Sequence, residues 1–397
     1  MTGMIFQTFD DKRECVAIYQ DGKIYKKKPR HQLTKTWDYA ESLKDNQIQY
    51  AKYYCGGKSL DEACPENLRG EWEAVKEKLE AFRRSVGEAK LNLREHCFFD
   101  LIPPHVLLNY GQIKNKICNH VFATQAKPEN YDHMVDLVRV LTEIKNTKLN
   151  IDLTPLEGRR HEFKVRQFLK KISNIEPYIT YDMRGTKTGR LTSKAFPILT
   201  MDKEYRTILK PNNEWFLELD YNAAELRVML GLLGGGQPNE DLHDWNLKNV
   251  FKNGGTREEA KKRVFAWLYN PESKDRLLNK EYDRDSVLQK YYNGSQVTTF
   301  WNRTIDSDDH HALNYIIQST AADLFLRQMI KVWELLKGKE SQIAFCLHDS
   351  LVIDLAEKDQ VLAHEIKEEF ANTELGTFKV NVFGGKNFGE MKRMNVR

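Results

Sequence analysis

The sequence predicts an α+β protein in which a mostly helical first half precedes a mixed body of strands and helices. Up to about residue 175 the apolar residues recur at helical spacing over long stretches. From about residue 176, strand-like runs such as EWFLELDY and QIAFCLHDSLVIDL alternate with helical runs such as HALNYIIQSTAADLFLRQMIKVWELL. The 397 residues, 41% of them hydrophobic, are enough for two or three domains.

The first half is expected to contain one hairpin and three helices. Two short apolar runs around Gln20-Asp21-Gly22 predict the hairpin over residues 14–25, and the basic KKKPR after it is expected to be exposed. Apolar residues three or four positions apart predict helices over 66–92, 129–147 and 157–173, the last with a basic outer face.

Charge and cysteine content limit the class of protein. Lys plus Arg number 61 against 57 for Asp plus Glu, and the net charge of +4 permits a nucleic-acid partner without requiring one. The six cysteines form no CxxC pair, so reduced structural thiols are expected rather than a zinc site. No signal peptide pattern and no apolar run of about 18 residues is found, so we expect a cytoplasmic protein with no membrane partner.

Two aspartates lie at the ends of predicted strands. EWFLELDYNAAELR reads as a strand that ends at Asp220, followed by a helix, and FCLHDSLVIDL reads as two strands with Asp349 at the tight turn. Carboxylates on two rigid strands suit a pair of Mg²⁺ ions, which prefer oxygen ligands. Alternatively, Asp220 caps the helix beginning near Asn222, and spacing alone does not show that the two acids meet.

Four residues recur every four positions in TREEAKKRVFAWLYN: Arg257, Lys261, Phe265 and Tyr269. They lie along one helical face. The cations could hold a triphosphate and the aromatic rings could stack on a sugar or base. The alternative is a solvated basic helix end that packs through its two aromatic residues.

Together these segments resemble family A DNA polymerases, the group of bacterial DNA polymerase I. DYNAAELR is similar to motif A of that family, the spaced R, K, F and Y to motif B, and LHDSLV to motif C. Four further segments resemble the family in its own order along residues 186–391: TKTGRLTS, DLH, ALNYIIQSTAADL and GKNFGEM.

The resemblance implies a right-hand α+β fold with a palm built on an antiparallel sheet, helical fingers and a helical thumb. It divides the chain into 61–175 (thumb and start of palm), 176–232 (palm), 233–310 (fingers) and 311–397 (palm and C-terminus). Residues 1–60 have no assigned role and could be an exonuclease vestige or a docking module. A bacteriophage source, and thus the host bacterial cytoplasm, is expected.

The resemblance also implies the reaction and its residues. The chain would add dNTPs to a primer 3′-hydroxyl on primer–template DNA, with two Mg²⁺ ions held by Asp220, Asp349 and the Tyr221 carbonyl. His243, Arg257 and Lys261 would bind the triphosphate. Phe265 would lie against the sugar and base, Tyr269 at the templating position, and Glu225 would exclude a ribose 2′-hydroxyl. Contacts to the minor groove are expected from Arg190, Asn314, Gln318 and His348.

The sequence departs from the family pattern at several positions. Ser350 stands where the family has Glu, and Asp354 in the returning strand is not expected to replace it. Ala266 and Asn270 replace two glycines of motif B. The fingers region is shortened, and Arg303 is only a weak candidate for a family arginine.

Only 219 residues precede Asp220, so no proofreading exonuclease is expected in this chain. A separate exonuclease, a helicase-primase or a processivity factor could be partners. Two alternatives stay open at this point. One is a single-subunit RNA polymerase-like enzyme, against which Glu225 argues; the other is a catalytically weak DNA-binding relic, which Ser350 keeps open.

Overall fold

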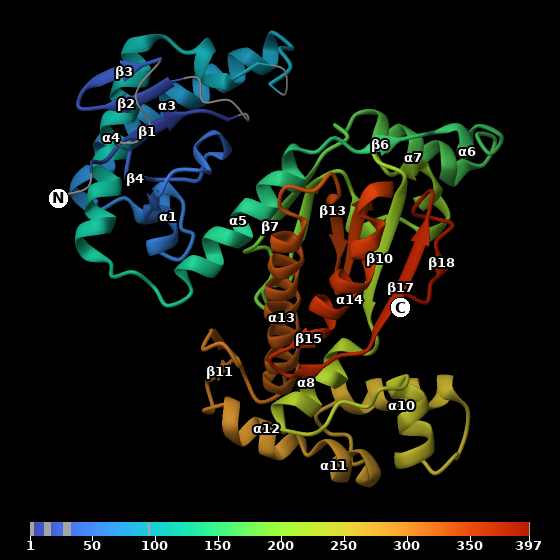
Figure 1. The fold of residues 1–397 in the computed structure, drawn as a ribbon. Coiled ribbons are helices and arrows are strands. Elements are labelled where there is room, and N and C mark those ends of the chain that lie inside the picture. The colour runs from blue at the N-terminus through green and yellow to red at the C-terminus, as the bar shows by residue number, and fades with distance from the viewer. Residues whose placement is uncertain (1–3, 12–16, 27–32, 94–95, 397) are drawn as a thin grey trace. The chain divides into compact units, whose positions relative to one another are not determined.

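The computed structural model describes residues 4–11, 17–26, 33–93 and 96–396, and the chain forms two compact units, Met1–Thr142 and Glu143–Arg397 (Figure 1). Residues 14–16 of the expected hairpin and 27–30 of KKKPR lie outside the described residues. The boundary between the units falls inside the segment 61–175, whose assignment to thumb and palm stays a prediction.

The first unit contains a three-stranded antiparallel sheet in the order β1-β2-β3. The hairpin between β2 and β3 turns at Asp21 and Gly22, which both have positive φ (49° and 75°), as a tight two-residue hairpin turn requires. The described part of the expected hairpin is therefore confirmed. The short elements of this unit are β1 (Gln7–Phe9), β2 (Ala17–Gln20), β3 (Lys23–Tyr25), β4 (Lys35–Thr36), η2 (Glu41–Leu43), β5 (Gln49–Tyr50), α1 (Ala51–Tyr54), α2 (Leu60–Ala63) and η3 (Phe98–Leu101).

Three long helices begin in this part of the chain: α3 (Glu66–Glu88), α4 (Pro104–Thr124) and α5 (Tyr131–Asn146). The helices expected over 66–92 and 129–147 are confirmed, with ends that are shorter by one to four residues. Helix α3 stops at Glu88 because the chain turns at Lys90, whose φ of 54° is incompatible with a right-handed helix. Trp72, Val75 and Leu79 of α3 share one core with Ile113 of α4.

The second unit is built around a five-stranded sheet in the order β13-β14-β10-β17-β18, in which every neighbouring pair is antiparallel. Side chains alternate between the two faces of the central strand β10. On one face Tyr221 stacks on Phe370 of helix α14, with ring centroids 4.3 Å apart. On the other, Phe216 packs edge-on against Phe345 and Phe388. The α+β fold class with an antiparallel palm sheet is confirmed.

Apart from the elements between α8 and α13, the strands and α-helices of this unit are β6 (Asn150–Ile151), α6 (Thr154–Glu157), α7 (Phe163–Ser173), β7 (Ile179–Asp182), β8 (Thr192–Ala195), β9 (Leu209–Lys210), β10 (Trp215–Tyr221), α8 (Ala224–Leu232), α13 (Ala312–Leu336), β13 (Gln342–Leu347), β14 (Ser350–Leu355), α14 (Ala363–Ala371), β15 (Asn372–Thr373), β16 (Gly376–Thr377), β17 (Val380–Gly385) and β18 (Lys392–Arg393). Short 3-10 turns lie at η4 (Ile198–Thr200), η5 (Lys203–Ile208) and η7 (Glu357–Leu362).

Between α8 and α13 the chain forms a group of short helices that lies beyond the Asp220 end of β10 (Figure 1). The family resemblance assigns this group to the fingers. Its elements are α9 (Leu242–Trp245), the π-helix η6 (Asn246–Val250), α10 (Arg257–Tyr269), α11 (Arg276–Tyr282), α12 (Arg284–Tyr291), β11 (Gln296–Thr298) and β12 (Thr304–Asp306).

The helix expected over 157–173 is wrong at its start. Helix α7 begins at Phe163, and residues 158–162 form turns instead. Arg159 pairs with Glu162 at 2.8 Å and with Glu204 at 2.7 Å, so its side chain holds this turn against η5.

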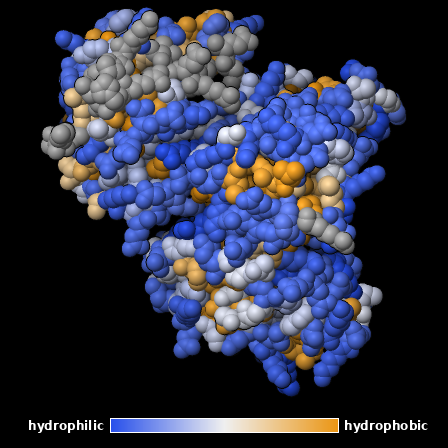
Figure 2. Space-filling model, viewed as in Figure 1, coloured by the Kyte–Doolittle hydropathy of each residue, from blue (hydrophilic) through white to orange (hydrophobic). Residues whose placement is uncertain are grey.

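The described cysteines are all free thiols: Cys55, Cys64, Cys97, Cys118 and Cys346. Burial raises the pKa of Cys118 and of Cys346 to about 12, so both stay protonated and unreactive, as expected for structural thiols. In the described ranges no helix combines the length and the apolar character that crossing a membrane requires. The face seen in Figure 2 is mostly hydrophilic, with small apolar patches.

Candidate active site

Sheet register brings the two aspartates to the same end of the sheet. Asp220 on β10 pairs with Ser350, the first residue of β14, and Asp349 immediately precedes it. Leu347 and Ser350 pair across β13 and β14, so the turn consists of His348 and Asp349, with His348 at a φ of 52°. The capping alternative for Asp220 is wrong, because helix α8 starts after Ala223, and no side chain caps it.

Both aspartates line one cavity of about 390 Å³. Burial and the negative charge of Asp349 raise the pKa of Asp220 to about 7. Burial likewise raises the pKa of Asp349. The Asn381 amide donates a long hydrogen bond of 3.4 Å to Asp220. Two carboxylates that repel each other in a partly dry cavity are the donor set that a divalent cation fits, because its charge would keep both ionised.

The basic helix α10 forms another wall of the same cavity. Its Arg257, Lys261, Phe265 and Tyr269 all line it, as the four-residue spacing requires. A capping box fixes the start of α10: the Thr256 hydroxyl accepts from the Glu259 amide, and the Glu259 carboxylate accepts from the Thr256 amide. The four side chains thus share one cavity with the two aspartates, and their role in binding a nucleotide stays a prediction.

His243 on α9 completes this wall. Its ring lies 5.9 Å from Phe265, and Nδ1 is buried with no hydrogen-bond partner among the described residues. Burial lowers the pKa of His243, so the imidazole is neutral near pH 7. Asp241 caps α9 and pairs with Arg257 at 2.8 Å, which holds the guanidinium in place.

Glu225 links two other expected site residues. The Arg190 guanidinium lies 2.5 Å from one of its carboxylate oxygens, and the Tyr269 hydroxyl donates to the other. Burial and this acid raise the pKa of Tyr269, which therefore stays protonated. Phe265 and Tyr269 lie parallel, with centroids 5.9 Å apart. Glu225 is consequently fixed at the cavity wall rather than free to swing.

The four expected DNA-contacting residues lie on three different elements near this cavity. Arg190 follows Gly189 in the loop before β8, Asn314 and Gln318 lie one turn apart on α13, and His348 lies in the turn beside Asp349. The Asn314 Oδ1 atom is buried without a partner among the described residues. Their role in contacting DNA stays a prediction.

Arg303, a weak candidate from the sequence, anchors the loop that carries Arg190. Its guanidinium donates to the Thr188 carbonyl (2.9 Å) and pairs with Asp323 of α13 (3.1 Å). Gly189 has a φ of 76°, which disfavours any residue with a side chain, and a Cβ atom there would lie 2.2 Å from this guanidinium, which would have to shift. Asn381 beside Asp220 was missed altogether, because the pairing of β17 with β10 leaves no local signal in the sequence.

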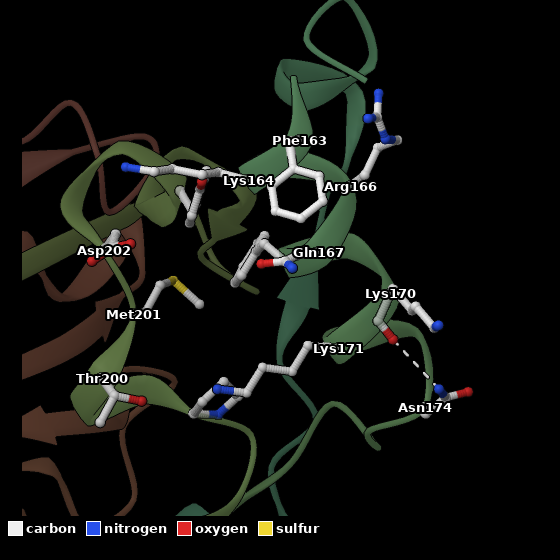
Figure 3. A pocket seen from close by; sticks show the side chains of 13 residues that line it. Phe163, Lys164, Arg166, Gln167, Lys170, Lys171, Asn174, Thr200, Met201 and Asp202 are labelled. Carbon is white, nitrogen blue, oxygen red and sulfur yellow. Dashed lines mark hydrogen bonds between the residues drawn. The ribbon is translucent and has the colours of Figure 1, made fainter. Parts of the chain in front are cut away.

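A second, larger cavity of about 940 Å³ lies along α7 (Figure 3). Its cations all come from that helix: Lys164, Arg166, Lys170 and Lys171. Phe163 at its edge is 66% exposed, and Asp202 is the one acidic residue that lines it. None of the three lysines has an ion-pair partner in the part of the chain that the structure describes.

Residues 295–390 match the sequence model of DNA polymerase family A. This part of the chain is therefore similar to the family A DNA polymerases. The match contains Asp349, Asn314 and Gln318, whereas Asp220 and α10 lie outside it. The family resemblance seen in the sequence is thus confirmed.

Curated relatives and a solved structure extend this likeness beyond residues 295–390. DNA polymerase I of Borreliella burgdorferi is 25% identical over 362 residues, which cover 70% of this chain and 40% of that protein. DNA polymerase I of Caldicellulosiruptor bescii is 24% identical over 251 residues, covering 49% and 30%. The chain therefore spans less than half the length of these relatives.

The POL domain of Pol1 from M. smegmatis, solved in complex with a DNA primer-template and dNTP, has the same fold. Its TM-score is 0.67 at 14% identity, with 97% of this chain and 96% of that chain covered.

Proposed function

We propose that this chain is a template-dependent DNA polymerase that adds dNTPs to a primer 3′-hydroxyl by two-metal nucleotidyl transfer. The observation that carries the proposal is the shared cavity: Asp220 of β10 and Asp349 of the turn before the paired strand β14 line it together with the cationic helix α10. The family match and the relatives named DNA polymerase I support it.

Asp220, Asp349 and the Tyr221 carbonyl would hold the two Mg²⁺ ions. When bound, the ions would lower the cost of forming a 3′-oxyanion and of releasing pyrophosphate. The chain's own contribution is to fix one carboxylate on β10 and the other in the tight turn before its partner strand β14, so that no reorganisation is needed during the reaction. Among the described residues no cluster of three or more His, Cys, Asp or Glu is arranged around one point. Backbone, water and substrate oxygens would therefore complete the ligand set.

The incoming triphosphate would lie along α10. Lys261 and Arg257 supply positive charge. Because the pKa of His243 is lowered, its imidazole is neutral and can donate one hydrogen bond to a phosphate oxygen. Phe265 would contact the sugar and base, and Tyr269 would stack at the templating position.

Glu225 would exclude ribonucleotides, because its carboxylate occupies the cavity wall and is held by Arg190 and Tyr269. Arg190, Asn314, Gln318 and His348 would then contact the minor groove of the newly formed base pairs, where acceptor positions are alike for all correct pairs. A cytoplasmic location, a separate exonuclease or processivity partner, and the lack of proofreading stay predictions.

Primer extension on a defined template tests the proposal. The purified chain should add the nucleotide that complements each template position, and chelation of divalent cations should stop it. Equal use of rNTPs and dNTPs would favour the RNA polymerase-like alternative. Primer binding without any extension would favour the DNA-binding relic.

Metal dependence should vary with pH. Because the pKa of Asp220 is raised to about 7, protons compete with the metal below that pH. The Mg²⁺ concentration for half-maximal extension should rise roughly tenfold between pH 7.5 and pH 6, since the ionised fraction falls by about that factor. Mg²⁺ titrations of the extension rate at both pH values measure this. The same half-maximal concentration at both values would contradict the raised pKa.

The basic cavity along α7 should contribute to DNA affinity. Lys170 and Lys171 can each neutralise one phosphate, and each such contact contributes a slope of about −0.9 to the salt dependence of binding. K170E/K171E should weaken primer–template binding several-fold at low salt and reduce this slope. Fluorescence anisotropy across a salt series measures both quantities.

The matched control for these lysines is the double variant K337E/K358E, which reverses two exposed lysines outside the cavity. If this variant weakens binding as much as K170E/K171E, then net charge rather than the cavity accounts for the effect.

A further inference from the structure

Ser350, which stands where the resemblance has a glutamate, makes a specific contact in this fold. Its side chain is buried, and its hydroxyl donates a hydrogen bond of 2.8 Å to Glu218 Oε1. Ser350 is also the residue that pairs with Asp220 in the sheet. The hydroxyl therefore joins the strand that carries Asp220 to the turn that carries Asp349.

Glu218 lies on the same face of the sheet as Asp220. The two residues are two positions apart on β10, and side chains of a strand alternate between its faces. Leu217, Leu219 and Tyr221 are buried on the opposite face. Glu218 is partly exposed, and the described part of the chain offers it no ion-pair partner. A carboxylate without an ion-pair partner among the described residues is thus held two positions before Asp220 on the same face, close enough for its charge to act on Asp220.

We propose that Glu218 is the third acidic residue of the metal site and that Ser350 positions it. In this chain the acidic group has moved from the strand after Asp349 to the neighbouring strand, and the serine hydroxyl orients it there. This inference rests on the proposed function, because it concerns the same cation site.

Glu218 is assigned to the outer part of the site rather than to direct contact with the ion. The described residues form no cluster of three or more metal-ligating side chains around one point. Mg²⁺ keeps several of its water ligands in protein sites, and a nearby carboxylate accepts hydrogen bonds from such waters. Partners of this kind contribute about 10- to 100-fold to metal affinity.

A purely structural role for the contact makes a different prediction. If Glu218 served only to satisfy the buried Ser350 hydroxyl, its loss would lower stability and leave metal affinity unchanged. Metal binding measured without catalysis therefore separates the two roles.

The test is Mn²⁺ binding, followed by electron paramagnetic resonance, to the full chain without dNTP. E218Q should raise the Mn²⁺ dissociation constant about tenfold. S350A should raise it by a smaller factor, about threefold, because the carboxylate remains but is no longer oriented. The double variant E218Q/S350E should bind Mn²⁺ within about threefold of the wild type, since it restores a carboxylate at the position of the resemblance.

Two comparisons keep this test decisive. E214Q removes an acid just before the same strand, whose carboxylate accepts from the Glu357 amide, and it should not change Mn²⁺ binding. Thermal unfolding of each variant without metal shows which of them are folded. If E218Q is unfolded, the Mn²⁺ affinity of S350A decides the question: an unchanged affinity in folded S350A would contradict the proposal. Wild-type affinity in folded E218Q, or no recovery in E218Q/S350E, would overturn the proposal.

Failure here is distinguishable from failure of the proposed function. If D220A abolishes primer extension while E218Q binds Mn²⁺ like the wild type, only the role of Glu218 is wrong. If D220A extends primers normally, the catalytic site itself is wrongly assigned.

Discussion

Replacing Asp220 or Asp349 by alanine is expected to lower the rate of primer extension 10³-fold or more, about 4 kcal/mol in barrier height. Asp220 lies on β10 and Asp349 in the turn between β13 and β14, and register places Asp220 opposite Ser350, next to Asp349. Removing either carboxylate leaves a cavity that can no longer hold two cations against each other's repulsion. Single-turnover extension at saturating Mg²⁺ and dNTP measures the effect.

The matched control is Asp354→Asn on the same strand β14. Asp354 is buried and accepts hydrogen bonds of 2.8 Å from the amides of Asn212 and Asn213, far along the strand from Asp349. This variant should lower the unfolding temperature and leave the extension rate within about threefold where the fold is intact. Extension by D220A or D349A at the rate of D354N would contradict the assigned site.

Replacing Asp220 by alanine should raise the stability of the metal-free fold at pH 8 although it lowers the rate of extension. The pKa of Asp220 is raised to about 7 from 3.8, so ionising it in the metal-free fold costs free energy, and stability is lost progressively as the pH rises from 3.8 to about 7. D220A should therefore unfold at a higher temperature than the wild type at pH 8 without metal. At pH 4 that advantage should vanish, because the carboxyl is protonated there in the folded state.

Replacing Glu225 by alanine is expected to reduce the preference for dNTPs over rNTPs on the order of 10²-fold, about 2.7 kcal/mol. The carboxylate is held at the cavity wall by Arg190 and by the Tyr269 hydroxyl, so it cannot move aside for a 2′-hydroxyl. Without it the wall is open and the extra oxygen fits. The ratio of kcat/KM for a dNTP and the matching rNTP measures the change.

Two further variants sharpen this prediction. Tyr269→Phe keeps the ring but loses the hydrogen bond to Glu225, so it should reduce the preference only in part. Glu240→Ala removes an exposed acid that pairs with Lys248, and it should leave the preference unchanged. An unaltered ratio in E225A would show that another group excludes ribonucleotides.

Much of the candidate site followed from local pattern. Arg257, Lys261, Phe265 and Tyr269 recur every four residues, and a helix with that spacing must present them together, as α10 does. The two strands around Asp349 were likewise evident, because a polar pair between apolar runs allows little except a tight hairpin. Such signals are contained within about a dozen residues.

The ends of helices were harder to predict from the sequence, because they depend on contacts with segments far away along the chain. The start of α7 at Phe163 depends on Arg159, whose pairing with Glu204 joins the turn to a segment 45 residues later. The loop of Arg190 similarly depends on Arg303, which reaches it from more than a hundred residues away. No local periodicity reports contacts of this kind.

Local pattern was enough to predict the α+β class, the family resemblance, the cationic face of α10 and the two aspartates as candidates. The pairing of distant strands was needed to bring Asp220 and Asp349 into one cavity, to place Asn381 beside Asp220, and to let the Ser350 hydroxyl donate to Glu218. The physical reason is that helical periodicity is set by neighbours along the chain. The register of a sheet is set by strands far apart in sequence, and shifting it by one residue would turn every side chain to the other face.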